Sequence, residues 1–129
     1  MKYYLSLGSN INPEINFDLA ISALNKILNK TERSSIYKTQ AEGFDGDDFL
    51  NFIFCGISSL SFDSLNKKLK DIEVRSGRDR NAPKFSSRTL DIDIVLQLSD
   101  AEEILFESDE IAKYRFVSEP LQELLWVYL

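Results

Sequence analysis

Two segments with the period of an amphipathic helix alternate with short strand-like segments, and this order constrains the fold more than any other feature. The first helical segment opens at Asn12-Pro13 and continues to about Lys30, with apolar residues at three- and four-residue spacing. The second runs over residues 61–76 and ends at Gly77, a glycine position typical of a helix C-terminus. The order β-α-β-β-α-β predicts a ferredoxin-like α+β fold, an antiparallel sheet with helices packed on one face. Strands are expected at residues 2–7, 34–39, 49–59 and 89–96.

The remaining segments and the composition fit one domain over residues 1–129. Residues 40–48 are expected to form a loop, residues 78–88 an exposed, mobile loop, and residues 120–127 a short helix. No apolar run is long enough for a signal segment or a membrane span, so no membrane partner is expected. The single Cys55 excludes an internal disulfide and a multi-thiolate zinc site, which predicts a reducing, cytoplasmic compartment.

The chain contains no histidine, which excludes Ser-His and Cys-His nucleophilic catalysis and histidine-based metal sites. Its net charge of −6 is unevenly distributed. The segment from Arg75 to Arg88 contains five cationic residues and one acidic residue, Asp79, so it carries +4 and the rest of the chain carries −10. A short cationic window in an acidic chain favours a small anionic ligand over a long nucleic acid.

The segment from Arg88 to Val95 contains the most informative pair of side chains. On a strand, Asp91 and Asp93 point to the same face, roughly 6.5 Å apart along the chain. Leu90, Ile92 and Ile94 then point to the other face, toward the core. Two carboxylates at this spacing can hold hard cations such as Mg²⁺, and two such ions would clamp a polyphosphate. The alternative is that they form only the hydrated face of an edge strand.

The cationic window leaves a similar choice. A helix dipole explains one or two arginines near the end of the second helix, but the series continues through Lys84 to Arg88. Carboxylates and arginines beside a loop are the groups needed to bind Mg-nucleotide and stabilise phosphoryl transfer. The turn at Gly8-Ser9-Asn10 matches neither a P-loop nor a dinucleotide fingerprint, and Asn51 suits either a structural amide or a ligand contact.

At this point the motifs resemble those of the 6-hydroxymethyl-7,8-dihydropterin pyrophosphokinase family, across roughly residues 3–97. The Arg-Thr-Leu-Asp-Ile-Asp-Ile segment at 88–94 is the most specific of them. The supporting motifs are Leu5-Ser6-Leu7-Gly8-Ser9-Asn10, Ile36-Tyr37-Lys38-Thr39, Phe49-Leu50-Asn51, and Ile72-Glu73 followed by Gly77-Arg78-Asp79-Arg80.

The resemblance implies transfer of pyrophosphate from ATP to the hydroxymethylpterin, with two Mg²⁺ ions held by Asp91 and Asp93. It implies catalytic roles for this aspartate pair and for three arginines, Arg78, Arg80 and Arg88. ATP would contact Glu73, Arg78, Lys84, Arg88, Ile94 and Arg115. The pterin would contact Thr39, Gly43, Phe49, Asn51, Phe85 and Phe116. A monomer is expected, with ATP and the pterin as its partners.

Departures from the family pattern support a second hypothesis. Ser86-Ser87 replace a Gly-Pro pair, Ser108 stands at a histidine position, and Tyr114 stands at an arginine position next to Arg115. The alternative to a full enzyme is therefore a weakened or non-catalytic relative that binds pterin or nucleotide. A ferredoxin-like RNA-binding module is disfavoured by the acidic remainder and by the lack of an aromatic RNP-type strand.

Overall fold

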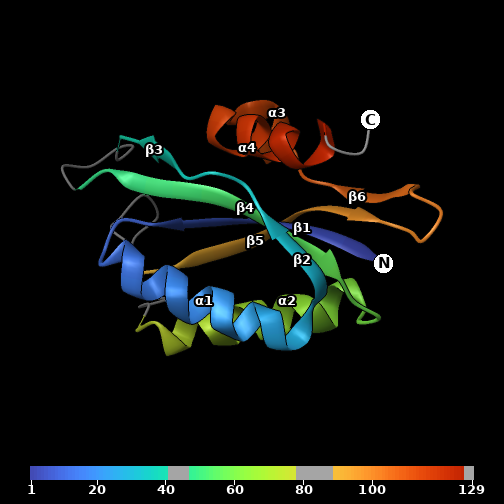
Figure 1. Cartoon of the computed structure of the whole chain (residues 1–129), viewed down its shortest axis with the longest axis horizontal. Coiled ribbons are helices and arrows are strands. Elements are labelled where there is room, and N and C mark those ends of the chain that lie inside the picture. The colour runs from blue at the N-terminus through green and yellow to red at the C-terminus, as the bar shows by residue number, and fades with distance from the viewer. Residues whose placement is uncertain (41–46, 78–88, 127–129) are drawn as a thin grey trace.

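A six-stranded antiparallel sheet organises the protein, with strand order β2-β4-β1-β5-β6 and β3 paired with β4 (Figure 1). The computed structural model describes residues 1–40, 47–77 and 89–126. The strands are β1 (Lys2–Ser9), β2 (Asn29–Arg33), β3 (Tyr37–Thr39), β4 (Phe49–Ile57), β5 (Asp91–Leu98) and β6 (Ile104–Glu107).

The helices cover both faces of the sheet. Helices α1 (Pro13–Ile27) and α2 (Phe62–Arg75) lie on one face, and α3 (Glu110–Lys113) and α4 (Arg115–Trp126) lie on the other (Figure 1). The predicted ferredoxin-like α+β arrangement is confirmed, but packing on one face holds for α1 and α2 only. The C-terminal helices cover the opposite face because it too is apolar.

Alternation along the strands produces these two apolar faces. Tyr3, Leu5 and Leu7 of β1 face α1 and α2, whereas Tyr4 faces α4. Burying a leucine fully, as at Leu5, stabilises the fold by about 1.5–3 kcal/mol. The central strands therefore contribute apolar residues to two cores. The α4 core comprises Tyr4, Ile53, Cys55, Val95, Leu96, Val117, Leu121 and Leu124.

Helix α2 ends at the predicted Gly77 signal, and the structure adds a cap at its start. The Ser61 hydroxyl accepts a hydrogen bond from the Ser64 amide at 3.2 Å and caps the N-terminus. After the helix, Gly77 adopts a positive φ of 89°, a left-handed conformation that suits glycine. At the start of α1, Pro13 lies in the first turn as predicted, and Asn12 occupies the N-cap position without a capping side-chain hydrogen bond.

Two predictions between α1 and β4 are wrong. Helix α1 ends at Ile27 rather than near Lys30, and the next residues form β2, whose sequence is almost entirely polar and carries no apolar alternation. The predicted strand 34–39 is interrupted at Ser34, whose hydroxyl replaces a main-chain partner by accepting from the Ile53 amide at 2.9 Å. Only β3 remains of it.

The C-terminal helix also begins earlier than predicted. Pro120 suggested a helix start because proline favours the first turn, but α4 begins at Arg115 and contains Pro120 in its interior. The buried residues Val117, Leu121 and Leu124 recur at helical spacing from before the proline, so packing on the sheet extends the helix.

Within the described part of the chain, none of the helices combines the length and the hydropathy that crossing a bilayer would require.

Candidate active site

Asp91 and Asp93 lie on β5 as the alternation predicts. Both side chains are partly exposed, whereas Ile92 and Ile94 between and after them are buried in the core under α1 and α2. The two carboxylates therefore point to the sheet face that carries α3 and α4. Asp93 is 40% exposed, which leaves it accessible to a ligand.

The register of the three central strands aligns Asp91 with a buried amide. Gly8 of β1 is the partner of Asp91 on one side and of Asn51 on the other. Directly paired residues share a face, so the three residues form one row across the sheet. With neighbouring strands about 4.8 Å apart, the two side chains stand roughly 10 Å apart across a glycine.

Gly8 leaves the space that the Asn51 side chain occupies. A Cβ at position 8 would lie 2.9 Å from the Asn51 Oδ1, closer than real contacts of this kind. Asn51 is 5% exposed, and its Nδ2 donates to the Thr39 hydroxyl at 3.0 Å. The row thus contains an oriented amide that can present donors and acceptors to the edge of a planar ring.

Two aromatic side chains lie on the same face of the sheet as this row. Phe49 opens β4, two residues before Asn51, and is paired with Thr39 of β3. Phe116 lies in the first turn of α4, on the same side of the sheet, and its ring stacks on Tyr114 with centroids 4.9 Å apart. Four predicted pterin contacts are therefore placed on one face of the sheet: Thr39, Phe49, Asn51 and Phe116.

Two side chains of α2 cover the outer edge of β5 beside the aspartates. In the described residues, β6 pairs with β5 only at Leu96 and beyond, so the edge at Ile92 lies past the end of β6. There the Ile92 amide donates to Glu73 Oε2 at 2.8 Å, and Lys70 Nζ donates to the Ile92 carbonyl at 2.8 Å. Lys70 also donates to Glu73 Oε2 at 2.9 Å and to Asp93 Oδ1 at 3.1 Å.

This arrangement shifts the pKa of two groups beside the aspartates, Lys70 and Glu110. Burial alone would lower the pKa of the Lys70 ammonium, but the Asp93 and Glu73 carboxylates outweigh it and raise that pKa above its ordinary value. Glu110 of α3 responds to the same aspartates: burial, and then the charges of Asp93 and Asp91, raise its pKa. The aspartate pair therefore produces a negative field that reaches both α2 and α3.

The donor set of the pair suits a hard cation. In the described residues, no group of three or more Asp, Glu, Cys or His side chains is arranged to hold a metal ion. Two carboxylates on one strand face nevertheless match the way Mg²⁺ binds in phosphoryl-transfer sites, where one or two carboxylates are completed by water and substrate phosphates. Asp91 and Asp93 fit such an ion.

The predicted ATP contacts are placed less uniformly. Glu73 is 1% exposed and its carboxylate is bonded within the protein, while the Ile94 side chain lies in the core, so only its main chain could meet a nucleotide. Arg115 is 91% exposed and pairs with Glu119 at 3.2 Å. The other predicted contacts lie outside the described residues: Arg78, Arg80, Lys84 and Arg88 for ATP, and Gly43 and Phe85 for the pterin. The predicted mobile loop 78–88 lies there too.

Ser108 and Tyr114 have structural contacts of their own. The Ser108 hydroxyl accepts from the Glu110 amide at 3.2 Å, and the Ser108 amide donates to the Val95 carbonyl at 2.9 Å. These bonds attach the start of α3 to β5. Tyr114 stacks on Phe116 beside the α4 core.

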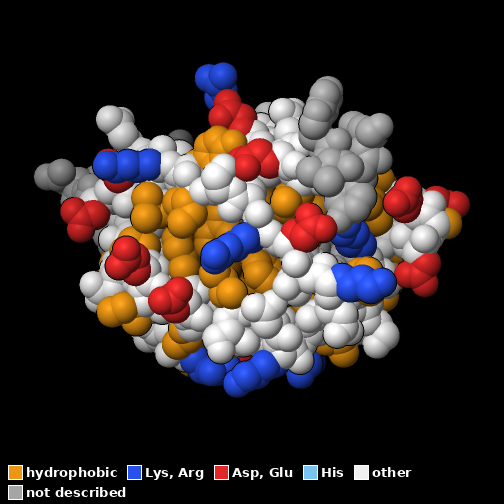
Figure 2. All heavy atoms as spheres, viewed as in Figure 1, with side chains coloured by type: hydrophobic (Ala, Val, Ile, Leu, Met, Phe, Trp, Pro, Cys, Tyr) orange, Lys and Arg blue, Asp and Glu red, His pale blue; other side chains and the backbone are white. Residues whose placement is uncertain are grey.

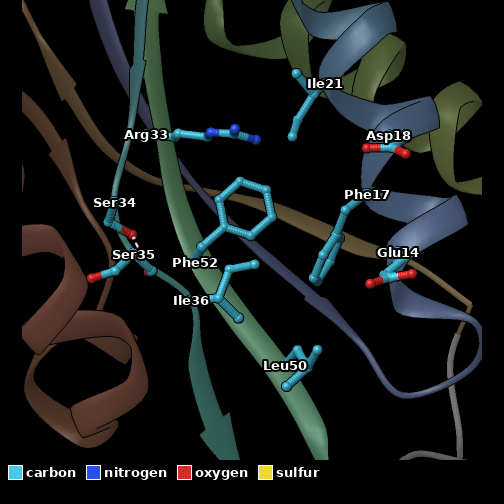
Figure 3. A pocket seen from close by; sticks show the side chains of 10 residues that line it. All are labelled: Glu14, Phe17, Asp18, Ile21, Arg33, Ser34, Ser35, Ile36, Leu50 and Phe52. Atoms are coloured by element: carbon cyan, nitrogen blue, oxygen red, sulfur yellow. Dashed lines mark hydrogen bonds between the residues drawn. The ribbon is translucent and has the colours of Figure 1, made fainter.

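A hollow on the other face of the sheet collects none of the predicted site residues. It has a volume of about 640 Å³ and lies between α1 and the strands β2 and β4, with Phe17 and Phe52 as its floor (Figure 3). Glu14 and Asp18 stand on its helix side and Arg33 on its strand side (Figure 3). In the view of Figure 2, apolar side chains gather near the middle of the molecule, with charged ones around them. The predicted chemistry is on the opposite face, so we place the candidate site there.

Sequence reasoning missed Lys70 and Glu110. A signal existed for the first, because Glu73 and Lys70 are three residues apart on α2 and Glu73 adjoins the buried Ile72. An acidic residue on a buried stripe requires a partner, and the lysine one turn earlier supplies it. Glu110 carries no such signal, since its proximity to the aspartates depends on how α3 folds over β5.

The comparisons with known proteins agree with one another on the family. The sequence model of the family described as 7,8-dihydro-6-hydroxymethylpterin-pyrophosphokinase (HPPK) matches residues 4–125. The 2-amino-4-hydroxy-6-hydroxymethyldihydropteridine pyrophosphokinase of Aquifex aeolicus is 38% identical over 95 residues, which cover 72% of this chain and 59% of that protein.

Two longer relatives are similar as well. The folate synthesis bifunctional protein of Arabidopsis thaliana is 29% identical over 127 residues, covering 94% of this chain and 26% of that protein. The folate synthesis bifunctional protein of Chlamydia caviae is 37% identical over 100 residues, which cover 71% of this chain and 22% of that protein. This chain thus spans 59% of the Aquifex relative and about a quarter of each bifunctional one.

Proposed function

Since this chain belongs to the 7,8-dihydro-6-hydroxymethylpterin-pyrophosphokinase family, we propose that it transfers pyrophosphate from ATP to 6-hydroxymethyl-7,8-dihydropterin. The observation that supports the proposal is the row Asn51-Gly8-Asp91, which brings a buried amide and a partly exposed carboxylate onto one sheet face.

In this proposal the pterin edge is read by Asn51. Its orientation is held by the Thr39 hydroxyl, so the amide is pre-organised before the ring binds. Phe49 and Phe116 supply apolar surface for the two ring faces. The hydroxymethyl group would then extend along the row toward Asp91 and Asp93.

The aspartate pair would organise the phosphates. Two Mg²⁺ ions held there would neutralise the phosphate oxygens and the charge that develops as the β-phosphorus is attacked. The pterin hydroxyl oxygen forms the new bond to the β-phosphorus, the α–β bridging bond breaks, AMP leaves, and the hydroxyl proton is released. The arginines at 78, 80 and 88 are proposed to contact the phosphates, and positioning supplies most of the acceleration.

AMP release tests the proposal. Purified protein should release AMP from ATP only when both the hydroxymethyldihydropterin and Mg²⁺ are present. Asp91→Ala should abolish AMP release, whereas the exposed helix variant Lys68→Ala should retain it. No AMP from the wild type, together with unchanged ATP affinity in Asp91→Ala, would refute the catalytic assignment.

One observation favours a second candidate, a relative that binds ligands but turns over weakly. In the described C-terminal segment, the two cations nearest Phe116 are paired with carboxylates, Lys113 with Asp109 at 2.9 Å and Arg115 with Glu119 at 3.2 Å. Both pairs are exposed, so a phosphate would have to compete with a carboxylate for each cation. Calorimetry that detects pterin or ATP binding without AMP release over hours would establish this candidate, and prompt AMP release would eliminate it.

A further inference from the structure

Lys70 joins the outer edge of β5 to the aspartate pair. Its ammonium is within hydrogen-bond distance of three acceptors at once: Glu73 Oε2 at 2.9 Å, the Ile92 carbonyl at 2.8 Å and Asp93 Oδ1 at 3.1 Å. Glu73 completes the arrangement from the other side by accepting the Ile92 amide at 2.8 Å. Helix α2 thus provides, through two side chains, the donor and the acceptor that a neighbouring strand would otherwise offer to Ile92.

We infer that Lys70 is a positioning residue of the metal-binding pair, which orients Asp93 and, as a fixed counter-charge, weakens the pair's affinity for free divalent cations. The inference rests on the proposed function, because it assigns the pair to metal binding. It concerns a residue of α2 that belongs neither to the row Asn51-Gly8-Asp91 nor to the cationic segment 75–88.

Orientation follows from the contact geometry. An aspartate on a strand edge can rotate about its side-chain bonds, but Oδ1 of Asp93 is held by an ammonium that is itself anchored to the Ile92 carbonyl and to Glu73. Glu73 is 1% exposed and Lys70 25% exposed, so the anchor is held in the protein interior rather than on a mobile surface side chain. A fixed carboxylate lowers the entropy cost of arranging the phosphate-bearing complex.

The charge effect follows from Coulomb's law. Lys70 is one positive charge among the carboxylates of Glu73, Asp93 and Asp91, with Glu110 of α3 facing the same pair from the other side. Removing the ammonium makes the site more negative. A unit charge within a few ångströms of a divalent ion, even in a water-like dielectric, changes its binding constant by roughly tenfold.

Two substitutions separate the charge from the hydrogen bond. Lys70→Met removes both, and Lys70→Gln removes the charge while keeping a donor for the Ile92 carbonyl. Lys67→Met is the matched control, because it removes the same charge from an exposed position on the same helix. Mn²⁺ is titrated into each protein without pterin or nucleotide, free ion is counted by electron paramagnetic resonance, and thermal unfolding is followed in EDTA.

We expect both Lys70 variants to bind Mn²⁺ about tenfold more tightly than wild type, and Lys67→Met to bind it within twofold of wild type. In EDTA, Lys70→Met should unfold at the lowest temperature and Lys70→Gln between it and wild type. In turnover assays, kcat should fall in both Lys70 variants, because Asp93 is no longer oriented, while KM for Mg-ATP changes little.

Unchanged or weaker Mn²⁺ binding in the two Lys70 variants would overturn the inference, because an edge-covering role alone would lower stability without raising metal affinity. Equal tightening in Lys67→Met would overturn it as well. If the wild type binds no Mn²⁺, the metal assignment and the inference both fail. If it binds Mn²⁺ but releases no AMP, only the proposed activity fails.

Discussion

The close approach of Gly8 to Asn51, in the row Asn51-Gly8-Asp91, yields the sharpest prediction. In Gly8→Ala, the new Cβ would lie 2.9 Å from Asn51 Oδ1, with the next neighbours at 3.9 and 4.0 Å. The strand itself accommodates the methyl group, so the Asn51 side chain must move away. Movement of the Asn51 side chain breaks its 3.0 Å hydrogen bond to the Thr39 hydroxyl. Because Asn51 is only 5% exposed, water cannot readily replace that hydrogen bond.

The magnitude follows from the cost of that lost partner. Leaving a buried neutral amide without its hydrogen bond costs about 1–3 kcal/mol. Because each 1.4 kcal/mol is a factor of ten in affinity, pterin binding should weaken by about 5- to 140-fold. ATP affinity should remain near that of the wild type, since the Asp91 and Asp93 carboxylates are not displaced.

Calorimetry with the pterin, and separately with an ATP analogue, measures both affinities. Gly56→Ala is the control, because its Cβ would also lie 2.9 Å from a neighbour, the Leu28 Cβ, at the far end of the same strand pair. It should lower the melting temperature without changing pterin affinity. Both variants are measured at a temperature below their melting temperatures. Unaltered pterin affinity in Gly8→Ala, or an equal loss of pterin affinity in Gly56→Ala, would refute the reasoning.

Three further predictions concern stability. The pKa of Glu110 is raised from 4.5 by burial and by Asp93 and Asp91, so its contribution to stability is fully present below pH 4.5 and is lost as the pH rises through the folded-state pKa. Glu110→Gln should therefore flatten the dependence of the melting temperature on pH above 4.5, measured in EDTA. Ser61→Ala removes the cap on α2 and should cost about 1 kcal/mol in urea unfolding. Glu123→Ala removes the acceptor of the Ser35 amide and hydroxyl and of the Tyr37 hydroxyl; it should cost about 1–2 kcal/mol, with Glu119→Ala nearly neutral.

Local signals were sufficient for the elements that carry the site. Alternation of polar and apolar residues placed Asp91 and Asp93 on one face of β5, and the structure confirms it. The helical period and Gly77 defined α2 to within a residue at each end. These features depend on short-range geometry, which neighbouring residues determine by themselves.

Long-range pairing decided the rest. The alignment of Asn51 with Asp91 depends on the register of β4 and β5 with β1, and no local pattern specifies that register. Likewise, the start of α4 at Arg115 was decided by packing against the sheet, despite a proline that locally suggests a later start. The contact of Lys70 with Asp93 joins residues 23 positions apart.

By itself, then, the sequence determined which residues could do chemistry: a histidine-free chain with paired aspartates on a strand and an amide on another. The tertiary structure alone decided that a glycine separates them, that α3 and α4 cover their face, and that an α2 lysine neutralises part of their charge. The physical reason is that residue type and periodicity act over a few positions, whereas distances between charges are determined only when the sheet is assembled.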